Sequence, residues 1–149
     1  MRLVIQRVSK AAVYVDENEV GRIKKGLLVF IGVGKYDNDT DLTWLINKLV
    51  NMRIFPDQTG KMNNSIADVN GSILLVSQFT LYASTKKGNR PSFVNSADPD
   101  NAKFLYNKFI AALKELSIYV ETGVFGANMQ IELLNDGPVT VCLDSKNKE

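Results

Sequence analysis

Two short, uninterrupted apolar runs constrain the fold of this chain more than any other feature. Residues 27–33 read Leu-Leu-Val-Phe-Ile-Gly-Val, and residues 73–76 read Ile-Leu-Leu-Val. Runs this short and this apolar are typical of strands that are buried on both faces. We therefore predict that both segments lie in the interior of a β-sheet, with 27–33 as a central strand.

Two other stretches carry apolar residues at helical spacing. The first covers residues 42–50 and follows helix-capping side chains at 37–40, and the second covers 102–113 and follows Asp98-Pro99, a favourable helix start. Each repeat places its apolar residues on one face, as expected of an amphipathic helix packed on a core. The repeating residues are Leu42, Leu45, Ile46, Leu49 and Val50 in the first stretch, and Ala102, Leu105, Tyr106, Phe109, Ile110 and Leu113 in the second.

The rest of the chain alternates strand-like and loop-like segments. Two long loops are predicted, a polar one at 57–71, with Met62 and Ile66 turned inward, and a basic one at 84–93. We predict one domain over residues 1–149 with an α/β fold of the α+β type, in which two main amphipathic helices pack on mixed, mostly antiparallel β-sheet. The further expected strands are 2–8, 11–16, 20–24, 118–120, 131–134 and 139–143.

Two near-absences in the composition exclude several kinds of chemistry. The chain has no histidine and one cysteine, Cys142. A Ser-His-Asp triad, a Cys-His pair, a histidine general base and almost all zinc sites are thereby excluded, so we expect neither a metal nor a cofactor. Cys142 lies in a strand-like apolar run and is expected to be a buried small hydrophobe.

Charge and hydropathy set the expected location and limit the partners. The net charge of +2 is too small to indicate nucleic-acid binding by itself. The apolar part of the N-terminus is too short for a signal peptide, and no run approaches the length of a membrane span. We therefore expect a cytoplasmic protein without a membrane partner.

The polar residues that follow the apolar run 73–76 are the first candidate for a functional site. Ser77, Gln78 and Thr80 arrive together around Phe79 at the predicted strand end. Polar side chains at the end of a buried strand are costly unless partners or a ligand satisfy them. They either cap neighbouring backbone groups or form a wall of hydrogen-bond donors at the mouth of a pocket.

The chemistry available at such a site is narrow. Neither Ser77 nor Thr80 has an evident base in the sequence, and the carboxylates are scattered. Backbone N–H groups that stabilise an oxyanion remain available, and one such donor contributes roughly 2.7–4 kcal/mol. That contribution suffices only for a substrate that is already activated, such as a reactive ester.

Two further segments each have a structural and a functional interpretation. Lys86, Lys87 and Arg90 could hold phosphate, although ordinary solvated loops have the same composition. The segment Asn135-Asp136-Gly137-Pro138 reads locally as a hairpin turn between two strands. Proline after glycine can also be cis, but the sequence does not show which isomer is present.

Taken together, these segments resemble the D-aminoacyl-tRNA deacylases (the D-tyrosyl-tRNA deacylase family), chirality-checking hydrolases of translation. The resemblance covers essentially the whole chain. It rests on Ser77-Gln78-Phe79-Thr80-Leu81 and Asn135-Asp136-Gly137-Pro138-Val139-Thr140, supported by the loop at 87–93 and the bend at 122–129.

The resemblance implies a homodimer with active sites at its interface. Gly137-Pro138 would be a Gly-cisPro pair that reaches into the other subunit's pocket, where its carbonyls exclude an L side chain. Ser77, Gln78, Phe79 and Thr80 would form the reaction centre with an oxyanion hole of backbone N–H groups. Residues of the 122–129 bend would bind the 3′-terminal adenosine: Phe125, Gly126, Ala127 and Met129. The substrate would be D-aminoacyl-tRNA, and the achiral glycyl ester on a non-cognate tRNA would also fit.

Two mechanisms are proposed for this family. In one Thr80 is a nucleophile, and in the other the 2′-hydroxyl of the terminal ribose assists hydrolysis. We favour RNA-assisted hydrolysis because no base for Thr80 is visible. Two rival functions stay open at this point. One is a non-catalytic nucleic-acid-binding protein that uses the basic residues at 86–90, and the other is a structural dimer whose strand-end polar groups merely cap.

Overall fold

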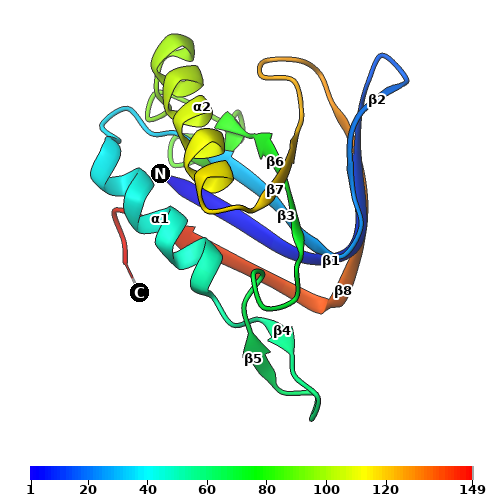
Figure 1. The fold of residues 1–149 in the computed structure, drawn as a ribbon. Helices are drawn as coiled ribbons and strands as arrows, with labels where there is room; N and C mark the ends of the chain where they lie inside the picture. Colours follow the sequence, from blue (N-terminus) through cyan, green and yellow to red (C-terminus); the bar gives the residue numbers. More distant parts are fainter. Residues whose placement is uncertain (149) are drawn as a thin grey trace.

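The computed structural model describes residues 1–148, which form a six-stranded sheet with two α-helices packed against one face (Figure 1). The strand order is β2-β1-β3-β6-β7, and β8 pairs with β1. The sheet contains β1 (Arg2–Val15), β2 (Asn18–Ile23), β3 (Gly26–Gly32), β6 (Ser72–Ser77), β7 (Tyr119–Thr122) and β8 (Gln130–Asp144). The other elements are α1 (Asp39–Asn51), α2 (Pro99–Glu115), the short 3-10 helix η1 (Phe79–Tyr82), and the hairpin of β4 (Phe55–Pro56) and β5 (Met62–Asn64).

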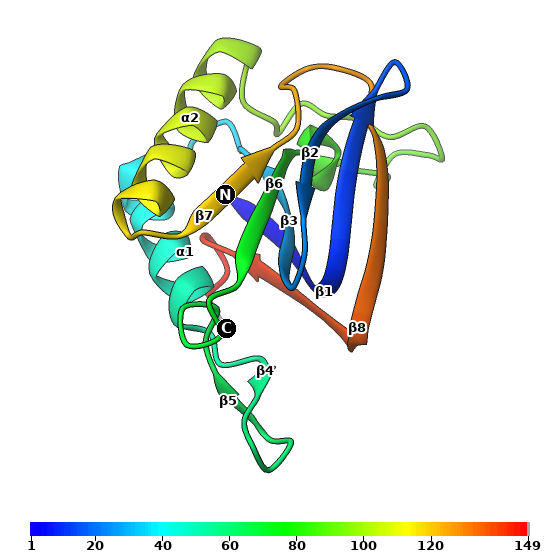
Figure 2. The same ribbon diagram turned by 45° about the vertical axis from the view of Figure 1, so that its right-hand side comes forward.

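The predicted interior strands are confirmed as β3 and β6. They pair in parallel, β6 pairs in parallel with β7, and the pairs that involve β1 are antiparallel. Residues 27–29 and 73–76 are at most 1% exposed because the core continues on both sides of these strands. Figure 2 shows the helices on one side, with β2 and the adjoining half of β1 lying forward of the inner strands.

Both predicted helices are confirmed, and local capping explains where each begins. Asn38 caps α1 in a reciprocal box with Asp41, and Asp98 caps α2 by accepting the N–H of Asn101 at 3.0 Å. Pro99 occupies the first turn of α2, where the missing N–H costs nothing. The apolar faces of both helices pack on one side of the sheet through Leu45, Leu49, Leu105, Phe109 and Leu113.

Two pairs of predicted strands are single long strands. The segments 2–8 and 11–16 are both parts of β1, and 131–134 and 139–143 are both parts of β8. The prediction of a hairpin turn at 135–138 is therefore wrong. The two strands pair along both halves, and register shifts near Val8 absorb the irregular residues. The Asn135 side chain meanwhile accepts the N–H of Val139 at 2.9 Å, a local bond that turn-forming residues favour.

Two burial predictions are wrong. Cys142 is exposed, because the outward side of β8 alternates with a half-buried side and no described element of the chain covers the outward one. Met62 is 55% exposed in the β4–β5 hairpin, which projects from the body (Figure 1), whereas Ile66 is fully buried as predicted. Within residues 1–148, neither helix is long and apolar enough to cross a membrane.

Candidate active site

A cavity of about 530 Å³ opens beside the carboxyl end of β6. Its walls come from the end of β6 with η1, from α2 and the segment before it, and from the loop between β7 and β8. The structure brings seven of the predicted site residues to this cavity: Ser77, Gln78, Phe79, Phe125, Gly126, Ala127 and Met129. Segments about fifty residues apart in the sequence therefore meet in one place, and their catalytic and binding roles remain predictions.

The end of β6 is held in place by β3. Ser77 is paired with Ile31, and the N–H of Gln78 continues the ladder by donating to the carbonyl of Ile31 at 2.8 Å. The chain then turns into η1 directly over Gly32. A Cβ at Gly32 would lie 3.0 Å from both the Gln78 carbonyl oxygen and Leu81 Cβ, so the glycine permits this close approach.

Thr80 lies outside the lining of the cavity and is exposed. Its hydroxyl accepts a hydrogen bond from the Gln78 side-chain amide. An amide N–H donor cannot remove a proton, and within residues 1–148 no carboxylate or amine is a hydrogen-bond partner of this hydroxyl. The geometry therefore gives Thr80 no base that would activate it as a nucleophile.

Aromatic side chains that were not predicted as site residues complete the cavity. Tyr106 on α2 donates its hydroxyl to the Leu75 carbonyl at 2.9 Å, and burial raises its pKa to about 12, so it stays a neutral donor. Its ring lies 5.7 Å from that of Phe125. Phe93 packs edge-on against Phe79 at 4.9 Å. The helical pattern indicated only a core position for Tyr106, and Phe93 was noted only as the last residue of the family-like loop at 87–93.

Gly137 and Pro138 do not line this cavity. They lie in the middle of β8, joined by a cis peptide bond, and both are exposed. In Figures 1 and 2 the bend of β8 lies at the opposite end of the sheet from the loop between β7 and β8. The two predicted halves of the site are therefore separate within one chain.

The basic residues Lys86, Lys87 and Arg90 are also exposed and outside the cavity lining. Their loop is closed at its base by two backbone hydrogen bonds between Ser84 and Ser92, of 2.8 and 2.9 Å. Phe93 follows this closure and lines the cavity. The three basic residues lie on the other side of the closure and do not form the cavity wall. The described residues contain no group of three or more His, Cys, Asp or Glu side chains that could hold a metal.

Arg7 is a buried cation that supports the Gly137 segment, and sequence reasoning missed it. Its guanidinium donates to the Asp136 carbonyl at 3.1 Å and to the Ile54 carbonyl, and it pairs with the Asp136 carboxylate at 3.2 Å. A Cβ on Gly137 would lie 3.0 Å from Arg7 Nη2. The one available signal was a charged residue at an otherwise apolar strand position, and buried charges need partners.

Replacing Arg7 with lysine is expected to lower activity by roughly 10- to 100-fold, because an ammonium cannot reproduce the forked contacts that hold residues 136–137. The measurement is turnover of the substrate proposed below, together with the thermal midpoint. Arg22→Lys is the matched control, since Arg22 pairs with Glu19 on the exposed part of β2. Wild-type turnover in Arg7→Lys would show that the contacts of the Arg7 guanidinium with residue 136 are not needed for activity.

The fold and site define a class of protein: an α/β domain whose polar strand end meets an apolar, aromatic cavity. Residues 4–144 match the model of the family described as "D-Tyr-tRNA(Tyr) deacylase". Relatives named "D-aminoacyl-tRNA deacylase" are 57% identical in Thermosipho africanus, over 98% of both chains, and 52% identical in Flavobacterium psychrophilum, over 100% of both. The chain belongs to the D-Tyr-tRNA(Tyr) deacylase family.

Solved structures share the fold. One is described as "c-Myc DNA Unwinding Element Binding Protein", with a TM-score of 0.91 and 37% identity over 97% of this chain and 98% of that one. Another is described as a "probable eukaryotic D-amino acid tRNA deacylase", with a TM-score of 0.82 over 95% of this chain and 97% of that one. The second is 19% identical, so it supports the architecture alone.

Proposed function

We propose that this protein hydrolyses the ester bond of D-aminoacyl-tRNA in the cytoplasm, as a proofreading step in translation. Residues 1–149 would act as one deacylase domain without a metal or cofactor. The observation that carries the proposal is the cavity in which residues 77–79 meet the loop at 125–129. The family assignment gives this cavity its substrate, and the absence of histidine from the sequence fits an activated ester.

The reaction adds water across the acyl carbon–ribose oxygen bond. Hydroxide from water bonds to the acyl carbon, the ribose oxygen leaves with a proton, and free D-amino acid and tRNA are the products. The carbonyl oxygen becomes negative in the transition state, and backbone N–H groups at the start of η1 would donate to it. The first N–H groups of a helix lack intrahelical acceptors, so Phe79 and Thr80 are suited to this role.

The RNA would supply the assisting hydroxyl. A ribose 2′-OH lies next to the 3′-ester and can position water or take part in proton transfer. Among the described residues Thr80 has no base, so its hydrogen bond with Gln78 is better suited to orienting the Gln78 side chain at the cavity. Ser77 and Gln78 would line the reacting carbonyl without forming a covalent intermediate.

The loop between β7 and β8 would bind the 3′-terminal adenosine. Phe125 and Met129 supply apolar surface in the cavity, with Gly126 and Ala127 between them. The small residues leave room for a flat base, and base stacking on aromatic side chains is worth roughly 1–3 kcal/mol. Lys86, Lys87 and Arg90 would contact phosphates farther along the acceptor end.

Chirality would be read by a second copy of the chain. Gly137 and Pro138 lie outside the lining of the cavity in their own subunit, and the exposed side of β8 is available for a partner and includes Leu134, which is 55% exposed. In a homodimer, the backbone carbonyls of this pair would enter the partner's cavity and exclude an L side chain. Glycine esters have no side chain on either face and would also be accepted.

Mixing two inactive variants tests the cross-subunit arrangement. Gln78→Ala and Gly137→Ala each damage one half of the proposed site, and a mixed dimer holds one intact site and one doubly altered site. After subunit exchange, about a quarter of wild-type turnover is expected if half the dimers are mixed. If both halves belong to one subunit, the mixture stays inactive, and that outcome would refute the dimeric site.

A non-catalytic RNA-binding protein is the alternative, in which Lys86, Lys87 and Arg90 hold phosphate. Both functions predict tRNA binding that weakens as salt rises. Only the deacylase predicts release of the D-amino acid, and Lys86→Ala/Lys87→Ala should weaken tRNA binding while ester cleavage at saturating tRNA persists. Salt-dependent binding with an intact ester would favour the alternative.

A further inference from the structure

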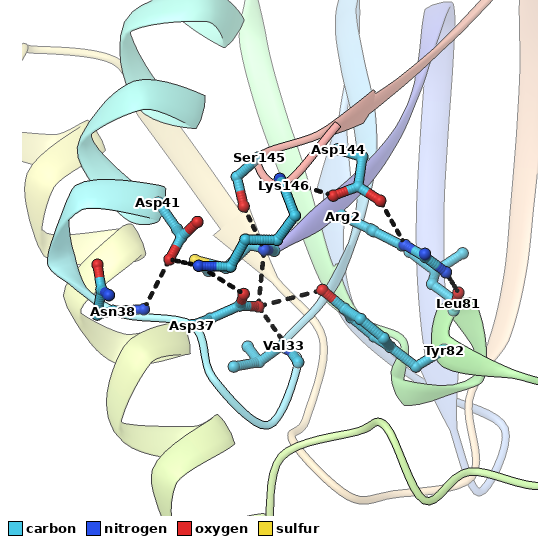
Figure 3. Close-up of polar contacts among 12 residues, drawn as sticks. Arg2, Val33, Asp37, Asn38, Asp41, Leu81, Tyr82, Asp144, Ser145 and Lys146 are labelled. Carbon is cyan, nitrogen blue, oxygen red and sulfur yellow. Dashed lines mark hydrogen bonds and ion pairs between the residues drawn. The ribbon is translucent and has the colours of Figure 1, made fainter. Parts of the chain in front are cut away.

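The α-amino group of Met1 is buried in the interior of the protein. Met1 is fully buried, and its ammonium lies 2.7 Å from the Asp37 carboxylate, whose side chain is 2% exposed. The same ammonium donates to the Ser145 hydroxyl, and Ser145 returns its N–H to the Met1 carbonyl at 2.9 Å. We call Met1, Gly34, Asp37, Tyr82 and Ser145 the N-terminal cluster; Figure 3 shows how Asp37, Tyr82 and Ser145 converge.

Asp37 is the hub of this cluster. One of its carboxylate oxygens accepts from the Met1 ammonium, the Gly34 N–H and the Tyr82 hydroxyl, the last at 3.1 Å. The next cation, Lys146, lies 3.9 Å from the other oxygen, is half exposed, and is closer to Asp41 at 2.8 Å. Burial lowers the pKa of the Met1 amine, and the Asp37 charge opposes that change. Without the ammonium, a buried carboxylate would lose its main counter-charge.

One arm of the cluster reaches η1. Tyr82 is the last residue of η1, which also carries Phe79 and Thr80. Its ring packs so closely over Gly34 that a Cβ there would lie 2.7 Å from it. The Arg2 guanidinium lies over the Tyr82 ring, with its Cζ 4.6 Å from the ring centroid, and it donates to the Leu81 carbonyl at 2.9 Å. The position of η1 is thus fixed from the N-terminus.

The second arm reaches another wall of the cavity. The Gly34 N–H bonds to Asp37, Gly34 forms a β-bridge with Ser96, and the Ala97 N–H donates to the Val33 carbonyl at 3.0 Å. Val33, Ser96 and Ala97 all line the cavity. Both arms therefore begin at the Asp37 carboxylate and reach residues of two different segments that line the candidate active site.

We propose that the free α-ammonium of Met1 is a positioning group for the active site, and that the enzyme is fully active only when this amine is neither acylated nor extended. A formyl group, an acetyl group or one added residue replaces the ammonium with a neutral amide and places extra atoms in a fully buried position. The catalytic part of this inference rests on the proposed deacylase function. The structural part, the ordering of η1 by the amine, stands apart from it.

The test compares two forms of the full chain released from a cleavable fusion, one beginning with free Met1 and one with a single glycine before it. Turnover of D-tyrosyl-tRNA, Tm, and amide hydrogen exchange of residues 78–84 are measured on both. The extended form is expected to lose roughly 10- to 100-fold in kcat, because small displacements of reacting groups are costly, while KM changes by less than about two-fold. The Leu81 and Ala83 amides should exchange faster.

A milder variant keeps the proposal testable if the extended chain does not fold. Tyr82→Phe keeps the ring over Gly34 and removes only the hydroxyl that bonds Asp37, so kcat should fall with little change in Tm. Tyr119→Phe is the matched control, since that exposed hydroxyl contacts Glu121 on β7. The proposal would be overturned if the extended form had wild-type kcat and unchanged amide hydrogen exchange in residues 78–84. If the extension unfolds the chain, the same two results in Tyr82→Phe would overturn it. If the native form releases no D-tyrosine, the proposed function fails, and the exchange rates still decide whether the amine orders η1.

Discussion

Replacing Gly137 with alanine is expected to lower turnover of D-tyrosyl-tRNA by at least about 100-fold, because small displacements in a catalytic site have effects of that size. Gly137 has φ +133°, a conformation that side-chain-bearing L residues rarely adopt. An added Cβ would lie 2.8 Å from Val139 Cγ2 and 3.0 Å from Arg7 Nη2. The segment 136–138 must therefore move, and with it the carbonyls proposed to read chirality.

Gly60→Ala is the control for this substitution. Gly60 also has a positive φ, of +82°, but no atom of the described residues lies within 4 Å of its Cβ position, and it is in the β4–β5 hairpin, which does not line the cavity. The Gly60→Ala substitution should lower Tm slightly, because alanine is strained at this positive φ, and should leave turnover unchanged. Circular dichroism and Tm establish that both variants are folded. A folded Gly137→Ala protein with wild-type turnover would remove this glycine from the mechanism.

Removing the 2′-hydroxyl of the terminal adenosine is expected to lower hydrolysis by roughly 100-fold or more, which corresponds to about 2.7 kcal/mol or more of transition-state stabilisation. Thr80→Ala is expected to lower the rate less than about ten-fold, because no described residue acts as a base for the Thr80 hydroxyl and its loss affects only the orientation of Gln78. Single-turnover rates on both substrates with both proteins separate binding from chemistry.

The opposite pattern would reverse this assignment. Near-complete loss of turnover in Thr80→Ala, with tRNA binding intact and the 2′-deoxy substrate cleaved normally, would make Thr80 the nucleophile. A burst of released tRNA before the D-amino acid appears would support the same conclusion, since a covalent acyl-enzyme would then accumulate.

Much of the fold was predictable from local pattern. The short apolar runs gave β3 and β6, and the helical repeats with their caps gave α1 and α2. The errors came from pairing that spans most of the chain. β1 and β8 pair with each other on both sides of Ser9 and on both sides of residues 136–139, so each strand continues past a segment whose local composition favours turns. Long-range pairing overrides local preference, and a single sequence does not display it.

The candidate site was predictable to a different degree in each part. Residues 77–80 stood out because polar groups follow a buried strand, whereas the link to 125–129 came from family resemblance and not from spacing. The contacts that hold the site in place could not be found from the sequence. Arg7 meets Asp136 and Met1 meets Ser145 across 129 and 144 residues, and such contacts leave no periodic signal in a sequence. Cys142 was misassigned because its apolar, strand-like neighbours indicated burial, whereas no described element covers the outward side of β8.

The most direct test of the function is parallel hydrolysis of D-tyrosyl-tRNA and L-tyrosyl-tRNA by the purified protein in the presence of a chelator. We expect rapid release of the D-amino acid, release of the L-amino acid at the uncatalysed rate, and no effect of the chelator. Equal rates for the two stereoisomers would contradict chiral selection by Gly137 and Pro138. Negligible hydrolysis of both, with tRNA binding retained, would contradict the enzyme itself and favour an RNA-binding protein.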